Sequence, residues 1–129
     1  MKTVNEYPPN YEQIKNTFEL HKGIVFTYGD TIYNPDSGFI DEFLMEHEKT
    51  HSIQQQKFGI VEWWNNYLTD VSFRLTQEIE AYQKQYKKAG EHLGRNQLFN
   101  FLKKISIDLS SAMYGNIISF DEAMDKIKN

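Results

Sequence analysis

One short segment of the chain, residues 44–51, carries residue types whose spacing suits metal chemistry. It contains the pattern H-E-x-x-H, formed by His47, Glu48 and His51. On an α-helix, residues i and i+4 lie on one face about one turn apart. Two imidazoles at this spacing can both reach one Zn²⁺ ion, at about 2.0–2.1 Å each. Glu48 follows the first histidine, where it can take a proton from a metal-bound water. The motif therefore predicts a zinc site with His47 and His51 as ligands and Glu48 as general base.

Both histidines fall on the apolar face of a helix predicted over residues 40–58, beside Phe43, Leu44 and Phe58. Two unpaired imidazoles one turn apart are costly to bury, and a shared metal ion satisfies both. The alternative is a pair of ordinary core or surface histidines, because the pattern arises by chance in roughly one chain per hundred of this composition. Their position on the apolar face favours the metal.

A catalytic zinc site needs a third protein ligand, and the chain has no cysteine to supply it. The candidates are two carboxylates on a second predicted helix, Glu78 and Glu80. At 100° per residue, Glu78 lies close to Val71, Leu75 and Tyr82 on the apolar face. Glu80 lies on the polar side, where it can pair with Lys84 one turn later. Since a buried carboxylate needs a cation, we expect Glu78 to be the ligand, with Glu80 in reserve.

Other residues near these helices have more than one possible role. Tyr114 lies in an irregular segment, where its phenol can donate to a developing oxyanion or simply pack; we take it as a second catalytic candidate. His92 could serve as the same donor. Arg74 could orient the third ligand, stabilise an oxyanion or pair with an aspartate, and a structural role is favoured. Gln54 either lines the site or is solvated.

Periodicity and turn residues predict a small β-hairpin followed by helices. The expected elements are a helix over 11–20 capped by Asn10, a strand over 23–28, a turn at Gly29-Asp30, a return strand over 31–33, the 40–58 helix ended by Gly59, a helix over 61–89 with a possible break at Thr69-Asp70, a helix over 97–109, and a last helix to residue 128 opened by a capping box at Ser119–Glu122.

The length predicts one domain, and the expected elements make it an α+β domain that is mainly α-helical. The chain has 129 residues, 40% of them hydrophobic, and a formal net charge of −4. There is no Lys/Arg-rich stripe, so we expect no nucleic-acid partner, and no apolar run long enough to cross a membrane. The first residues lack the apolar core of a secretory signal, so none is expected. The composition does not indicate an oligomeric state.

The arrangement of H-E-x-x-H followed by E-x-x-A on a second helix resembles the gluzincin metallopeptidases, the thermolysin-like group. Nearly the whole chain is similar to small metallopeptidases encoded by phages and prophages. The matching segments are residues 26–35, 47–55, Trp63-Trp64, 73–75, 78–82 and 114–116.

This resemblance implies a minimal zincin-like domain over residues 1–129, with the H-E-x-x-H helix packed on a second helix that bears the ligand glutamate. It implies zinc held by His47, His51 and a glutamate, a peptide or protein substrate paired along the strand at Ile24–Tyr28, and action in the bacterial host cytoplasm or on the virion. Larger gluzincins often have aspartate four residues after the ligand glutamate, whereas this chain has Tyr82. The alternative is a non-catalytic phage structural or binding protein stabilised by zinc.

Overall fold

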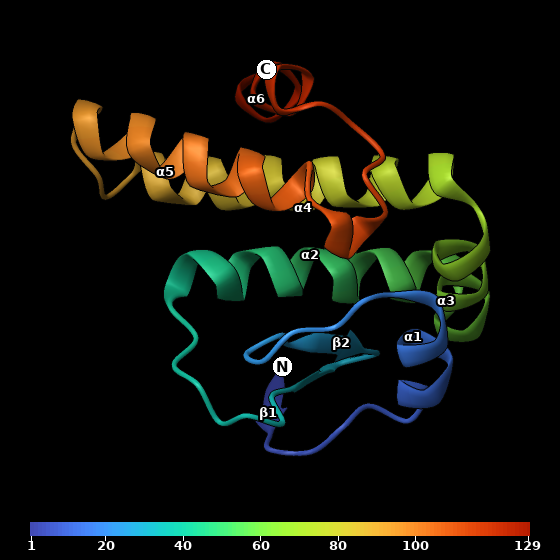
Figure 1. Cartoon of the computed structure of the whole chain (residues 1–129). Coiled ribbons are helices and arrows are strands. Elements are labelled where there is room, and N and C mark those ends of the chain that lie inside the picture. Colours follow the sequence, from blue (N-terminus) through green and yellow to red (C-terminus); the bar gives the residue numbers. More distant parts are fainter.

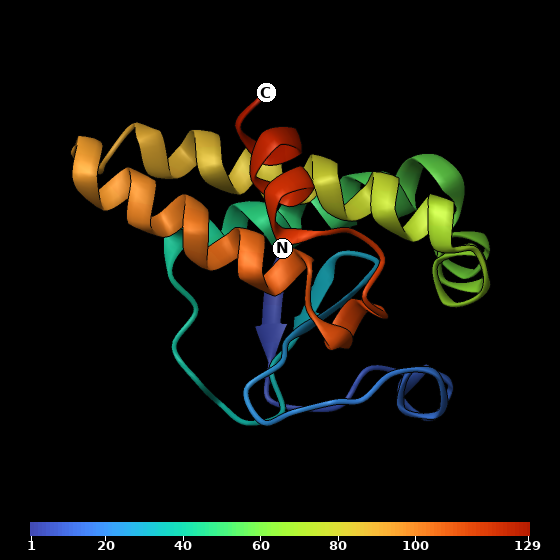
Figure 2. The same cartoon turned by 45° about the horizontal axis from the view of Figure 1, so that its top comes forward.

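A computed structural model describes all 129 residues as an α+β fold in which helices predominate. Helix α2 lies in the middle, with a small sheet on one side and α4 on the other (Figure 1). Helix α6 lies across α4 and α5 (Figure 2). The elements in chain order are β1 (Lys2–Val4), α1 (Tyr11–Thr17), β2 (Phe26–Tyr28), β3 (Thr31–Tyr33), α2 (Glu42–Phe58), α3 (Ile60–Thr69), α4 (Val71–Gly90), α5 (Arg95–Leu109), a 3₁₀ turn (Ala112–Tyr114) and α6 (Phe120–Lys128).

The sheet has the strand order β1-β3-β2, so β2 is an edge strand. The predicted hairpin is confirmed: Tyr28 pairs with Thr31 across a two-residue turn, in which Gly29 adopts a positive φ of 64°. Strand β2 covers only the last three residues of the strand expected over 23–28. Strand β1, which pairs in parallel with β3, has no counterpart in the sequence analysis.

Helix α2 begins and ends at residues suited to those positions. The side chain of Asp41 accepts a hydrogen bond from the backbone N–H of Leu44, at 2.8 Å, and so caps the first turn. Gly59 ends the helix with a φ of 99°, a conformation that side chains rarely adopt. The buried face of α2 is strongly polar, because all its fully buried residues carry polar or charged side chains: His47, Glu48, Thr50, His51, Ser52, Gln54 and Gln55.

The predicted break at Thr69-Asp70 is confirmed and separates α3 from α4. Asp70 has an extended backbone, and its side chain accepts from the N–H of Phe73, which starts α4. Val71, which periodicity places on the apolar face, is half exposed because it lies in the first turn after the break. The buried face of α4 instead follows Arg74, Glu78, Ala81, Tyr82, Gln85 and Ala89.

The other helix ends agree in part with the predictions. Helix α1 ends at Thr17 rather than residue 20, and the predicted cap at Asn10 is wrong because its side chain makes no capping hydrogen bond. The predicted start of α6 is confirmed by the bond from the N–H of Glu122 to the Ser119 hydroxyl, but the capping box is incomplete, because the Glu122 carboxylate accepts from that hydroxyl and not from the Ser119 backbone N–H. No helix combines the length and the apolar character that a bilayer crossing requires.

Two apolar clusters flank the region where α2 meets α4. One joins α1, β2 and α3, and the other joins α4, α5, α6 and the 3₁₀ turn. The first is built on Ile14, Phe26, Trp63, Trp64 and Tyr67; the second is built on Tyr82, Leu102, Ile105, Leu109, Tyr114, Ala123 and Ile127. Polar residues of α2 and α4 are thereby buried between the two apolar clusters.

Candidate functional site

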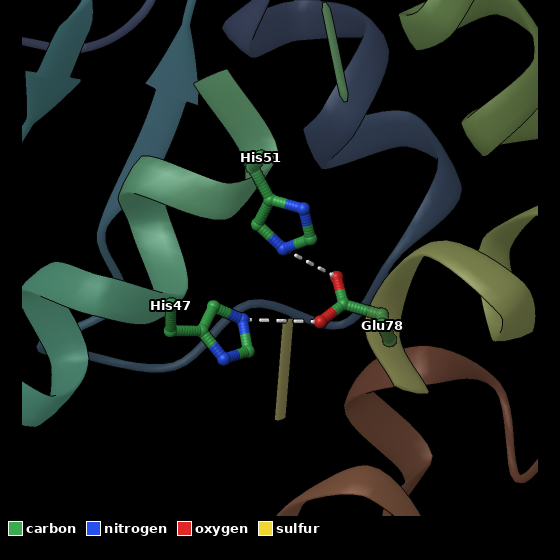
Figure 3. Close-up of side chains that lie close together, drawn as sticks. All are labelled: His47, His51 and Glu78. Carbon is green, nitrogen blue, oxygen red and sulfur yellow. Dashed lines mark ion pairs between the residues drawn. The ribbon is translucent and has the colours of Figure 1, made fainter. Parts of the chain in front are cut away.

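Two histidines of α2 and one glutamate of α4 converge in this buried region. Nε2 of His47 lies 3.2 Å from Oε1 of Glu78, and Nε2 of His51 lies 3.1 Å from Oε2 of the same carboxylate (Figure 3). One possible ligand atom from each residue lies within 4.8 Å of the others. All three residues are at most 5% exposed. The structure therefore brings together the three residues that the sequence singles out as ligands.

The Glu78 carboxylate and the His51 imidazole shift each other's pKa values. Burial alone lowers the pKa of His51, but the adjacent Glu78 carboxylate outweighs that effect and raises the pKa to about 9. Burial alone raises the pKa of Glu78, and His51 and His47 together reverse this and hold it well below its usual range. The carboxylate is thus ionised and requires a positive charge beside it, which a proton or a metal cation can supply.

The two oxygens of Glu78 differ in their partners. Oε2 accepts a hydrogen bond from the hydroxyl of Tyr67 at 2.5 Å, whereas Oε1 is fully buried and has no hydrogen-bond partner. Burial and the nearby carboxylate raise the pKa of Tyr67 well above its usual value, so the phenol remains a donor. Two imidazole nitrogens and one carboxylate oxygen form a donor set typical of three-ligand zinc sites, and the unpartnered oxygen fits a cation.

Each histidine is oriented by the side-chain oxygen of a glutamine. Nδ1 of His47 lies 2.9 Å from Oε1 of Gln85, and Nδ1 of His51 lies 2.8 Å from Oε1 of Gln54. An amide oxygen only accepts, so both Nδ1 atoms carry a proton and both Nε2 atoms face the cluster. Such contacts commonly orient metal-binding histidines. Tyr82 takes no part in this, because its ring packs edge-on against His47.

Glu48, the expected general base, is buried beside the cluster. Its Oε1 accepts a hydrogen bond from the Thr27 hydroxyl at 2.9 Å. Its Oε2 makes no hydrogen bond within the chain and lies 3.9 Å from Nε2 of His47. One oxygen is therefore held by strand β2, and the other is free to accept a proton.

Tyr114 is also near the cluster, through Tyr82. The two hydroxyl oxygens are 2.8 Å apart, and neither makes another hydrogen bond within the chain. One phenol proton bridges them, so the other is free to donate. Burial raises the pKa of both phenols well above the usual value, which keeps them protonated. Arg74 donates to the carbonyl of Tyr114 and to those of Tyr67 and Leu68, so its role is structural, as favoured by the sequence.

A cavity of about 280 Å³ opens onto the cluster, and 15 of its 27 lining residues are hydrophobic. His47, Glu48, His51 and Glu78 all contribute to its wall. The larger apolar side chains come from α1, the segment between α1 and β2, β2 itself, α2, α3 and α5: Ile14, Phe18, Leu20, Ile24, Phe26, Leu44, Trp63, Trp64, Phe101 and Ile105.

The edge of β2 that does not pair with β3 is only partly free to pair with another strand. The carbonyl of Thr27 already accepts hydrogen bonds from Nε2 of Gln55, at 2.9 Å, and from Nε1 of Trp64, at 3.2 Å. Gln55 also accepts from the N–H of Gly29. Of the pairing edge expected over Ile24–Tyr28, Thr27 and the residues after it are therefore not available to a substrate strand. Only the part before β2 remains available.

Several residues considered from the sequence lie outside the cluster. His92 is exposed on the surface, where its Nε2 lies 3.7 Å from Oε1 of Glu42. Glu80 does not join the cluster or pair with Lys84; it accepts a hydrogen bond from Gln54. Tyr67 and Gln85 contact the cluster although neither is among the site residues expected from the sequence. Gln85 could have been found, because it lies seven residues after Glu78 and so on the same face of α4.

Comparison with known proteins returns no match: no family model, no curated protein and no solved structure matches the chain. A function is accordingly inferred from the donor set of the cluster and from the groups around it.

Proposed function

We propose that the protein is a zinc-dependent peptidase in which His47, His51 and Glu78 hold the metal and Glu48 is the general base. One observation carries the proposal. Three buried donor groups converge on one point, with an unpartnered carboxylate oxygen among them, directly beside the free oxygen of Glu48. A purely structural ion needs no such carboxylate next to its ligands.

The chemistry that a bound zinc ion supplies is Lewis acidity toward a carbonyl group and toward water. His47, His51 and Glu78 would hold the ion with three protein ligands, the number typical of catalytic rather than structural zinc sites. Oε2 of Glu48 accepts the proton of the attacking water and later passes it to the leaving amine. The Thr27 hydroxyl holds the other oxygen of Glu48, so the carboxylate keeps its orientation while it does so.

The Tyr82–Tyr114 pair supports a second part of the mechanism. Because the two phenols share one hydrogen bond, one O–H remains to stabilise negative charge that develops on the carbonyl oxygen. We assign this donor to Tyr114. Arg74 holds the backbone of Tyr114 at its carbonyl and so fixes where the phenol lies.

The cavity favours a peptide or protein substrate with an apolar side chain next to the cleaved bond. Its wall is mostly hydrophobic, and apolar lining of this kind favours apolar groups. The backbone of Val25, just before β2, has no hydrogen-bond partner and lies in the same wall, so it is the segment of this edge best suited to pair with a substrate.

A second candidate function is a non-catalytic protein that zinc stabilises. The observation that favours it is the deep burial of the cluster between α2 and α4, where an ion would tie the two central helices together. In that case the ion raises the stability of the fold, and Glu48 has no chemical role.

The two candidates are separated by assaying hydrolysis of unfolded casein and of a peptide library, with zinc-loaded and chelated protein. Cleavage that requires the metal and is lost in Glu48→Gln supports the peptidase. If zinc-loaded protein cleaves nothing across these substrates but unfolds at a higher temperature than the metal-free form, the stabilising role is the correct one.

A further inference from the structure

The contact between Gln54 and His51 continues outward to a carboxylate on α4. Oε1 of Gln54 lies 2.8 Å from Nδ1 of His51, and Nε2 of Gln54 donates to Oε1 of Glu80 at 2.8 Å. We propose that Gln54 is a positioning residue for His51 and that Glu80 acts through it, by holding the amide in one orientation. The inference rests on the proposed function only in taking His51 as a metal ligand.

The orientation of the Gln54 amide follows from its three partners. Its nitrogen has two protons, and these are donated to the backbone carbonyl of Gln77, at 3.0 Å, and to the carboxylate of Glu80. Both partners are acceptors without a proton to give. A flipped amide would place its oxygen against two acceptors, so the oxygen must face His51.

A fixed amide oxygen in turn fixes the imidazole of His51. Nδ1 must carry the proton that the oxygen accepts, and Nε2 is directed toward Glu78. The chain of contacts therefore sets both the tautomer and the ring orientation that a metal ligand needs. Gln77 is itself held by Nε1 of Trp63, at 2.9 Å, which keeps this part of α4 in place.

His47 has no carboxylate behind its glutamine as His51 has. Gln85 accepts from Nδ1 of His47, but its own amide nitrogen makes no hydrogen bond within the chain. Glu80 thus distinguishes the two ligands: the amide nitrogen of Gln54 is held by two acceptors, whereas that of Gln85 has no hydrogen-bond partner within the chain. This also gives a role to a carboxylate that lies at the surface and has no cationic side chain within ion-pair distance.

The test is zinc affinity, measured by competition with a chelator, in four variants of the full chain. Gln54→Ala and Glu80→Ala should each bind zinc about 10–100-fold more weakly, as is typical when outer contacts of metal ligands are removed. Glu80→Gln keeps an amide oxygen that can accept from Gln54, so it should stay close to the wild type. The control is Gln56→Ala, an exposed glutamine of the same helix.

A second measurement does not need the metal. In protein labelled with ¹⁵N-histidine, the Nδ1–H proton of His51 should give a slowly exchanging low-field resonance, with or without zinc. This resonance should be lost in Gln54→Ala, exchange faster in Glu80→Ala, and persist in Glu80→Gln.

Wild-type zinc affinity in Glu80→Ala, together with an unchanged resonance, would overturn the inference and leave the proposed zinc site intact. A protein that binds no zinc but shows the expected changes in the resonance overturns the proposed function and retains the inferred chain of contacts. A Glu80→Gln variant as impaired as Glu80→Ala also contradicts the inference, because the amide then does not replace the carboxylate as an acceptor.

Discussion

Tyr67 donates its hydroxyl proton to Oε2 of Glu78 at 2.5 Å, and this contact distinguishes the two oxygens of that carboxylate. The other oxygen, Oε1, has no hydrogen-bond partner although it is buried. A metal ion can therefore bind Oε1 without displacing the hydrogen bond from Tyr67 to Oε2. The Tyr67 phenol on α3 thus leaves Oε1 of Glu78, and not Oε2, available to a metal ion.

Substitution Tyr67→Phe tests this relationship. It removes the donor but keeps the aromatic ring, so Glu78 loses the contact that orients it. We expect zinc to bind about 10–100-fold more weakly, with little change in the unfolding temperature of the metal-free protein. The matched control is Tyr86→Phe on α4, whose hydroxyl makes no hydrogen bond within the chain. Zinc affinity equal to or higher than that of the wild type would show that Tyr67 does not orient the ligand.

The zinc content of the protein tests the two histidine ligands. We expect about one zinc ion per chain by elemental analysis, and none in His47→Ala or His51→Ala, because two remaining ligands bind zinc poorly. The control is His92→Ala, which removes an exposed histidine. Zinc at 100 times its dissociation constant should stabilise the wild type by about 2.7 kcal/mol and leave both ligand variants unchanged. A wild type whose melting temperature does not respond to zinc contradicts the site.

The choice between the two carboxylates of α4 is tested by Glu78→Gln and Glu80→Gln. Only Glu78 lies within reach of both imidazoles, so Glu78→Gln should bind zinc far more weakly than Glu80→Gln. The neutral amide of the first variant also leaves the bound cation without its compensating charge. Both variants are measured in the same chelator competition. Equal losses in the two, or a larger loss in Glu80→Gln, would exclude Glu78 as the third ligand.

How far the sequence predicts this site depends on how local each contact is. The approach of His47 and His51 follows from helix geometry alone, since residues four apart share a face. The choice of Glu78 as the third ligand also follows from periodicity, even though Val71, expected on the same apolar face, is half exposed. The position of Glu78 within α4 relative to Leu75 and Tyr82 does not depend on where that helix starts.

The contacts that periodicity could not give join different elements. Tyr67 reaches Glu78 only because the chain breaks at Asp70 and α3 folds back beside α4. Strand β1 is three residues long with no apolar alternation, and it forms through parallel pairing with β3, distant in the sequence. Gln54 was ambiguous for the same reason, since its partners Gln77 and Glu80 lie on another helix.

The two phenols near the cluster make separable predictions for activity. Tyr114→Phe should lower the turnover of the best substrate found by the peptide screen by about 10²–10³-fold, the usual effect of removing one oxyanion donor. Zinc content should not change. Tyr82→Phe, which also breaks the pair, should have a smaller effect, because Tyr114 keeps its proton and remains free to donate. The reverse order of the two losses would assign the donor to Tyr82.

The last prediction separates an enzyme from a protein that zinc only stabilises, and it concerns Glu48. Glu48→Gln keeps the size of the side chain and an oxygen that can accept from the Thr27 hydroxyl, but it removes the ability to take up a proton. Since Glu48 is not a ligand in this assignment, zinc content and melting temperature should stay near those of the wild type. Hydrolysis should fall by about 10²–10⁴-fold, the usual contribution of a general acid–base. Zinc content and cleavage rate are measured on the same preparation, beside Glu46→Gln, which changes the neighbouring glutamate of α2. Unchanged cleavage in Glu48→Gln would exclude it as the base, whereas loss of zinc along with cleavage would mean that its carboxylate helps to hold the metal.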